Sequence, residues 1–160
     1  MASISGLRTT LTEGVRYRGN IGHWSWVAHR LTGLGILGFL TIHVWDTANA
    51  TFLPHVYAWS IDVFKHPFFG VGEVFVLGAV FYHALNGLRI TLLDWRPDWW
   101  HYQNKSAWIV WIVFLLLFVP AGGYLLISIF THCADIAAEG ASCWVLPNIA
   151  DYPADAVYYD

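Results

Sequence analysis

Three long apolar segments constrain this chain more than any other feature of its sequence. Residues 107–130 contain no charged side chain, residues 69–93 contain only Glu73 and Arg89, and residues 31–45 are again uncharged. About 20 consecutive apolar residues are enough to cross a bilayer as a helix. The first segment reaches that length if it extends back through Trp24, with the His29–Arg30 pair at the membrane interface.

The composition favours a membrane protein. Charged residues make up 12% of the 160 residues, whereas a soluble domain carries about 25%. The alternative, that the segments are buried core helices of a soluble protein, is disfavoured by three such runs in so short a chain. We therefore predict an all-α membrane protein whose anchor, residues 21–131, has three transmembrane helices over about residues 22–46, 69–93 and 107–131.

The basic residues predict the orientation of the helices. Seven of the eight Lys and Arg residues precede or open the first segment or surround the loop between the second and third, and only Lys65 lies on the other side. By the positive-inside rule, residues 1–20 are cytoplasmic and the acidic tail, residues 132–160, is extracytoplasmic. Cys133 and Cys143 lie in that tail, where a disulfide and two free thiols are both compatible with the sequence. No basic patch indicates a nucleic-acid partner.

Histidines inside the apolar segments indicate the chemistry. A buried imidazole in a bilayer is costly and usually functional, and neutral histidine is a common axial ligand of haem iron. His83 shares a helix face with Ala79 and Gly87, because residues four apart lie on one face. Small residues on both sides of an imidazole suit a flat macrocycle, but they are equally compatible with close helix packing.

Further candidate residues lie near the ends of the first two segments. Arg30, next to His29, suits a haem propionate or a quinone carbonyl, or it is an anchor among lipid headgroups. His43 lies 14 residues beyond His29, on nearly the same face and about 21 Å deeper. It is either a metal ligand or an interface residue bonded to Asp46. Arg89 is a candidate for a propionate contact.

Two motifs resemble a known family. The stretch His29-Arg30-Leu31-Thr32-Gly33 resembles the HRxTG signature of the cytochrome b subunit of succinate dehydrogenase. Residues 83–89, followed by Asp94, resemble the HxxxGxR…D signature of the same family. Three spans with a cytoplasmic N-terminus match as well. The motifs and topology together cover roughly residues 20–130, and the tail lies outside the resemblance.

The resemblance implies one of two small anchors in a prokaryotic cytoplasmic membrane, with a flavoprotein and an iron–sulfur protein docked on the cytoplasmic face. Succinate is then oxidised on the flavoprotein, and electrons pass through iron–sulfur clusters to a quinone. The resemblance places His83 at the haem b ligand, and Arg30 at the quinone pocket and haem propionate. It also implies a quinone-site serine three residues before His29, where this chain has Trp26, with Ser25 one position earlier.

The resemblance also implies the number of haems. Members with a histidine deep in the first span hold two haems, so His43 is expected to ligate a distal haem and His83 a proximal one. The second ligand of each haem comes from the partner anchor. Two haems suit a low-potential quinone such as menaquinone. A haem-free structural anchor and the equivalent anchor of a fumarate reductase remain as alternative functions.

Overall fold

The computed structural model describes residues 20–154, so the predicted cytoplasmic segment lies outside the described residues apart from Asn20. The described chain is all-helical and contains no strand, which confirms the predicted class. Its elements are α2 (Ile21–Phe52), α3 (Pro54–Phe64), α4 (Pro67–Trp95), the 3-10 helix η1 (Pro97–Tyr102), α5 (Gln103–Ala138) and the 3-10 helix η2 (Ile149–Asp151). Within this part of the chain, α2, α4 and α5 are the three helices long and apolar enough to cross a membrane.

Each of these helices extends past the apolar segment from which it was predicted. α2 continues to Phe52 and α5 to Ala138. At 1.5 Å per residue, the 36 residues of α5 are about 54 Å long, compared with about 30 Å of hydrocarbon in a bilayer. The ends of α5 therefore extend beyond the apolar core of the membrane.

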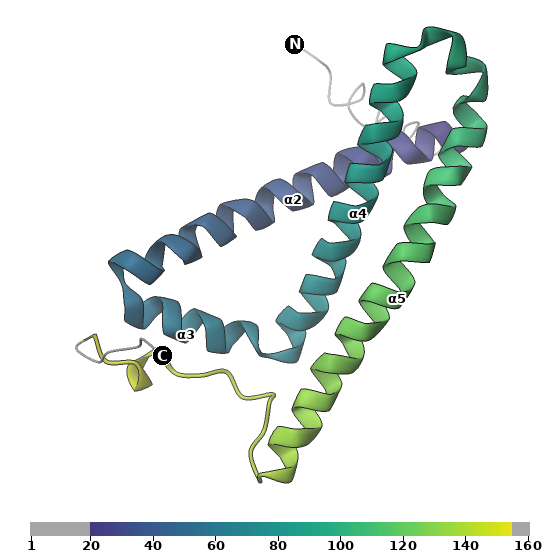
Figure 1. The fold of residues 1–160 in the computed structure, drawn as a ribbon. Helices are drawn as coiled ribbons and strands as arrows, with labels where there is room; N and C mark the ends of the chain where they lie inside the picture. The colour runs from purple at the N-terminus through teal and green to yellow at the C-terminus, as the bar shows by residue number, and fades with distance from the viewer. Residues whose placement is uncertain (1–19, 155–160) are drawn as a thin grey trace, which may run out of the picture.

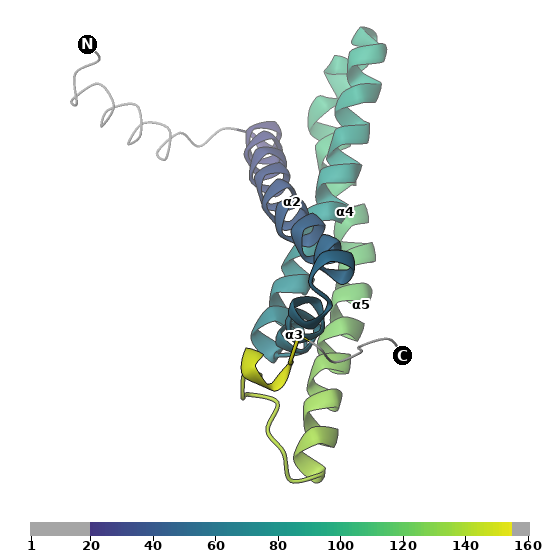
Figure 2. The same cartoon turned by 90° about the vertical axis from the view of Figure 1, so that its left-hand side faces the viewer.

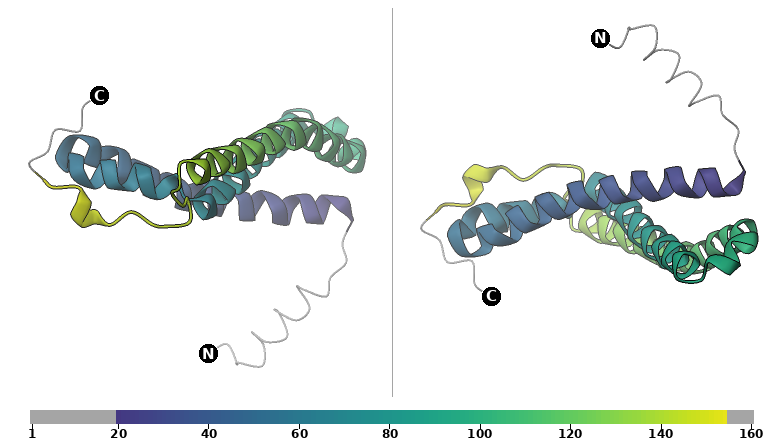
Figure 3. Two further views of the ribbon diagram at one scale, coloured as in Figure 1. Left: turned by 90° about the horizontal axis from the view of Figure 1, so that it is seen from below. Right: turned by 90° about the horizontal axis from the view of Figure 1, so that it is seen from above.

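α4 is the central helix and the most buried of the three. It runs beside α5, whereas α2 crosses α4 within the first turns of α2 and then diverges from it (Figure 1, Figure 2). α3 joins the far end of α2 to the start of α4, so that these three helices trace a triangle. Seen along the bundle, α2 lies on one side of the α4–α5 pair (Figure 3).

A row of buried residues spaced four apart joins α4 to α5. The row consists of Gly70, Val74, Gly78, Tyr82 and Asn86. A Cβ atom on Gly70 would lie 2.8 Å from Cδ1 of Ile129, and one on Gly78 would lie 2.9 Å from Cε2 of Phe118. The glycines therefore let the two helices approach closely, as small residues do at helix interfaces in membranes.

The corner between α2 and α3 is polar. Asp46, Asn49 and Ser60 are buried there, and the Ser60 hydroxyl donates a hydrogen bond to the Asp46 carboxylate. A buried carboxylate is costly unless it is hydrogen-bonded, so this contact stabilises the turn that returns the chain towards α4.

The described residues leave most of α2 uncovered. None of its most apolar 18-residue window is buried, and Leu31, Leu34 and Leu37 are all more than 60% exposed. In a membrane, such side chains face lipid or another protein.

The glycine row yields a prediction for stability. Gly78→Ala is expected to destabilise the α4–α5 pair by about 1–3 kcal/mol, because the added methyl group overpacks a filled contact. Gly72→Ala is the matched control, since nothing lies within 4 Å of the position of its Cβ. Denaturant titration of the purified protein measures both free energies of unfolding, and equal values would contradict the prediction.

Candidate functional site

The site lies where α2 crosses α4, and Ser25 is its structural centre. Ser25 is fully buried, and its carbonyl oxygen accepts hydrogen bonds from Tyr82 Oη (3.2 Å) and Asn86 Nδ2 (3.3 Å). Its hydroxyl accepts one from Trp111 Nε1 (3.3 Å), so that one residue of α2 is tied to both α4 and α5. Ser25 is also the predicted quinone contact, and both of its oxygen atoms accept hydrogen bonds within the chain.

One turn further along α2, two imidazoles meet face to face. The rings of His29 and His83 are stacked, with centroids 3.9 Å apart and planes 7° from parallel. The two signature histidines, 54 residues apart in sequence, therefore form a single site between α2 and α4.

A glycine of the opposite helix lies against each imidazole, and at Gly33 there is no room for a side chain. A Cβ atom on Gly33 of α2 would lie 2.9 Å from Cε1 of His83, closer than side-chain contacts allow. A Cβ atom on Gly87 of α4 would lie 3.4 Å from Cε1 of His29. The contacts are reciprocal: the histidine of each His-x-x-x-Gly stretch packs on the glycine of the other.

The hydrogen bonds around His83 fix its tautomer. His83 Nδ1 lies 3.1 Å from the carbonyl oxygen of His29, which is only an acceptor, so Nδ1 carries the proton. The hydroxyl oxygen of Thr32 lies 3.3 Å from the same nitrogen, and it donates its own proton to backbone carbonyls of α2. The neutral ring then has a free lone pair on Nε2, which has no hydrogen-bond partner among the described residues.

The ring of His29 makes fewer hydrogen bonds than that of His83. Its Nδ1 atom is buried and has no hydrogen-bond partner within the described part of the chain. A buried polar atom without a partner is uncommon and often marks a site for a ligand, ion or water. Within the described residues, neither ring nitrogen of His29 and only Nδ1 of His83 takes part in a hydrogen bond.

Arg30 and Trp26 lie on the exposed side of α2. The Arg30 guanidinium carbon stacks 4.0 Å from the centroid of the Trp26 ring, and both side chains are exposed. Within residues 20–154, no carboxylate pairs with Arg30. The two residues therefore form a flat cationic and aromatic surface beside the histidine pair.

Arg89 is held within the chain. Its guanidinium donates to Ser106 Oγ (2.9 Å), to the Gln103 carbonyl oxygen (2.8 Å) and to Asn86 Oδ1 (3.1 Å). These bonds fasten the end of α4 to the start of α5. A propionate contact, as expected from the sequence, would have to share this guanidinium with its present partners.

His43 lies apart from the other candidates. Its ring is exposed on α2 and stacks on Phe39 with centroids 5.3 Å apart. The alternative hydrogen bond to Asp46 is not formed, because Asp46 turns towards α3 and accepts from Ser60. Among the described residues, no group of three or more His, Cys, Asp or Glu side chains could hold a metal ion. A haem iron differs in that it takes its axial ligands singly.

Sequence reasoning identified the histidines but missed what positions them. Thr32, Gly33, Tyr82 and Trp111 were given no individual role, although the first two lie within the quoted HRxTG stretch. The signal was present in the repeated spacing: His29 precedes Gly33 by four residues, and His83 precedes Gly87 by four. Which glycine faces which histidine depends on how the helices cross.

The fold and the site define a three-helix membrane anchor with paired histidines at a helix crossing. Residues 8–122 match the family described as succinate dehydrogenase/fumarate reductase transmembrane subunit. The succinate dehydrogenase 2 membrane subunit SdhC of Mycobacterium tuberculosis is 41% identical over 129 residues, which cover 78% of this chain and 95% of that protein. The succinate dehydrogenase hydrophobic membrane anchor subunit of Archaeoglobus fulgidus is 34% identical over 105 residues, covering 66% and 88%.

The chain therefore belongs to the succinate dehydrogenase/fumarate reductase transmembrane subunit family. Its three apolar helices make it a membrane anchor of this kind of complex. The match ends at residue 122, so the last turns of α5 and the tail after it are outside the family model.

Proposed function

We propose that this chain is the haem b- and quinone-binding anchor of a succinate dehydrogenase, passing electrons from an iron–sulfur subunit to a quinone. The observation that carries the proposal is the His29–His83 pair, in which Nε2 of His83 has no hydrogen-bond partner within residues 20–154. The other partners are a flavoprotein, a second membrane anchor and the bilayer of a prokaryotic cytoplasmic membrane. The positive-inside rule favours a cytoplasmic N-terminus and an extracytoplasmic tail.

The residues at the crossing fit a haem b. His83 would supply one axial imidazole through Nε2, because the His29 carbonyl and Thr32 hold the proton on Nδ1. A hydrogen bond to the ring nitrogen that does not face the metal fixes the orientation of the imidazole and raises its basicity as a ligand. A bound haem would supply a one-electron redox centre, and the partner anchor would supply its other protein ligand.

A haem-free structural anchor is the competing function, and one observation favours it. The His83 ring already fills the space over Gly33 and stacks on His29, so the crossing packs through its own side chains. The two functions differ in a property of the purified complex, namely whether it shows the absorption of reduced b-type haem.

A pair of glycine variants tests the haem site. Gly33→Ala is expected to displace the His83 ring and remove one low-spin b-type signal, as His83→Ala would, because the added Cβ meets Cε1 at 2.9 Å. Gly35→Ala on the same helix is the control, since nothing lies within 4 Å of its Cβ position. Optical and EPR spectra of assembled complex provide the measurement. Low-spin spectra unchanged in both Gly33→Ala and His83→Ala would refute the assignment.

The exposed Arg30–Trp26 surface is the proposed quinone contact. A guanidinium stacked on an indole offers a cation for a quinone carbonyl and an aromatic face for its ring. Ser25 lies behind this surface with its oxygen atoms engaged in the helix crossing. Substitution of Arg30 therefore tests quinone binding without disturbing the packing at the helix crossing, whereas substitution of Ser25 would alter both.

Arg30→Leu is expected to weaken quinone reduction by about tenfold or more, the usual effect of losing a charge-assisted hydrogen bond. Reduction of an artificial dye by the soluble subunits should stay nearly unchanged. Arg96→Leu is the control, since Arg96 is also exposed and also lies over a tryptophan ring. Its guanidinium carbon is 6.0 Å from the centroid of the Trp99 ring. Equal loss of quinone and dye reduction would indicate failed assembly instead.

We propose His43 as the ligand of a second, distal haem. Its ring is exposed on the surface of α2 that residues 20–154 leave uncovered, so a haem held there would take its other ligand from the partner anchor. Redox sites at two depths of the membrane suit menaquinone, because its reduction by succinate is uphill and can be coupled to the membrane potential.

Haem content tests this assignment. The ratio of haem b to flavin in the purified complex is expected to be about two by this ligand count, and about one in His43→Ala. His132→Ala is the control, an exposed histidine at the end of α5 with no proposed ligand role. A wild-type ratio near one would remove the second haem and leave His43 as a surface residue.

A further inference from the structure

The chain beyond the family match continues α5 through the membrane boundary. From Ala107 to Ala134 no residue is charged, and Asp135 is the first charged side chain. Cys133 therefore lies at the level where α5 leaves the apolar core, about 3 Å past the end of the predicted span. α5 itself runs five residues further, to Ala138.

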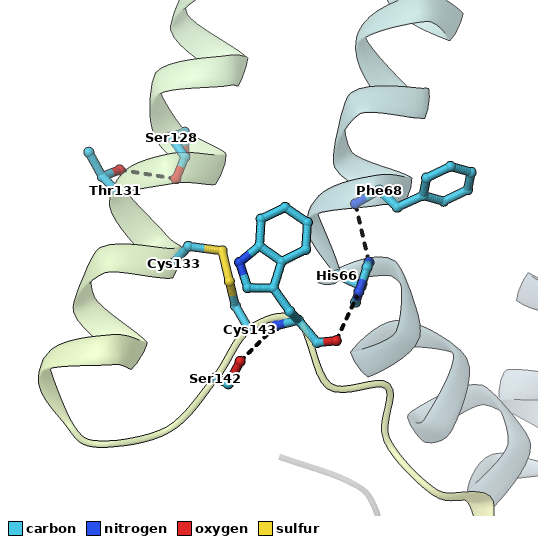
Figure 4. The surroundings of a disulfide bond; sticks show 8 residues. His66, Phe68, Ser128, Thr131, Cys133, Ser142 and Cys143 are labelled. Carbon is cyan, nitrogen blue, oxygen red and sulfur yellow. Dashed lines mark hydrogen bonds between the residues drawn. A yellow bond between two sulfur atoms is a disulfide. The ribbon is translucent and has the colours of Figure 1, made fainter.

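The tail turns back at the end of α5 and returns to this level. Gly140 has φ +81°, and the N–H groups of Gly140 and Ala141 bond to the carbonyls of Ala137 and Ile136. This is the Schellman pattern, in which glycine takes the left-handed conformation that ends a helix. A disulfide then joins Cys143 to Cys133, with Cα atoms 5.4 Å apart, and so fixes the residues after Cys143 near the membrane boundary (Figure 4).

Two hydrogen bonds hold the next residues against α3 and the start of α4. His66 Nδ1 accepts from the Phe68 N–H (3.2 Å), so Nε2 carries the proton that it donates to the Trp144 carbonyl (3.3 Å; Figure 4). Trp59 Nε1 donates to the Pro147 carbonyl at 3.0 Å. The tail is thus fastened on both sides of residues 144–146.

A third contact lies further along the tail, where the hydroxyl of Tyr152 donates to the Asp62 carboxylate. Burial acts to raise the pKa of Asp62, but the hydrogen bonds from Lys65 and Tyr152 and the charge of Lys65 outweigh it, so this pKa lies below its ordinary value. Asp62 therefore stays ionised at neutral pH and remains an acceptor for Tyr152.

The segment held in this way exposes consecutive apolar side chains. Trp144, Val145 and Leu146 are 63%, 71% and 55% exposed. The last turns of α5 also expose apolar side chains, since Ile127 is 65% and Phe130 is 55% exposed. Tryptophan is enriched at the membrane–water interface, where its ring spans apolar and polar surroundings.

We propose that residues 144–146 form a disulfide-fastened anchor that inserts into the lipid interface beside the end of α5. The contact is with the boundary between headgroups and acyl chains, because the three side chains are apolar and the tail has no Lys or Arg. The tail therefore has no Lys or Arg side chain that could pair with an anionic headgroup. The disulfide has a definite task in this arrangement: it returns the apolar segment to the level of Cys133 instead of leaving it beyond α5.

Site-specific photocrosslinking tests the proposal on the assembled complex. A benzophenone amino acid in place of Val145, in complex reconstituted into phosphatidylcholine nanodiscs, is expected to give several times more lipid adduct than the same group in place of Ala141. Ala141 is the matched control because it is exposed but lies at the turn beyond α5. Mass spectrometry separates lipid adducts from protein adducts.

The outcomes are distinct. Equal lipid adducts at the two positions would overturn the proposal, and so would a protein adduct at residue 145, which would show that a partner subunit covers this segment. Replacing half of the phosphatidylcholine by phosphatidylglycerol should leave the adduct yield unchanged, and a large rise would refute the apolar contact. In complex carrying Cys133→Ser with Cys143→Ser, the yield at residue 145 should fall towards that at residue 141. An undiminished yield would remove the role of the disulfide.

Discussion

The reciprocal packing of two imidazoles on two glycines sets how α2 meets α4, and most of the arrangement depends on it. His83 occupies the space over Gly33, and His29 the space over Gly87. Because glycine has no side chain, the backbones approach closely enough for the His29 carbonyl to reach His83 Nδ1. Packing at this crossing and the chemistry of His83 are therefore one feature: the contact that joins the helices also selects the ring nitrogen that stays free.

The polar groups at the crossing follow from the medium around them. In hydrocarbon, an unsatisfied backbone or side-chain polar group costs several kcal/mol, so partners must come from the protein. Tyr82, Asn86 and Trp111 meet this need at Ser25, and Arg89 meets it at the start of α5. Among the described residues, Nδ1 of His29 and Nδ2 of Asn49 are the buried side-chain atoms left without a partner, and the first belongs to the ring that stacks on His83.

Much of this could be predicted from the sequence, for identifiable reasons. The spans follow from uncharged runs that only a membrane tolerates, and the paired motifs brought His29, Arg30 and His83 into consideration. Which side chains of different helices contact each other could not be predicted, because this depends on the angle and register at which the helices cross. The sequence therefore did not indicate that Ser25 is buried and bonded to α4 and α5. Nor did it indicate that Asp46 accepts a hydrogen bond from Ser60 of α3 instead of from His43. The disulfide was one of two open alternatives, since sequence does not state whether two cysteines will lie 5.4 Å apart.

The two halves of α2 have different environments, and this difference bears on how the subunit works within a complex. The first half is locked to α4 and α5 by Ser25 and the histidine pair, whereas the second half diverges and is held at its end by the Asp46–Ser60 bond to α3 (Figure 1). α2 has 32 residues, and the described part of the chain leaves the apolar stretch between these two contacts uncovered. Helices gain most of their stability from packing, so what packs against this stretch in the complex matters for α2. His43 lies on this surface, so any ligand role for it depends on assembly with another subunit. His83, by contrast, is oriented by its own chain before assembly takes place.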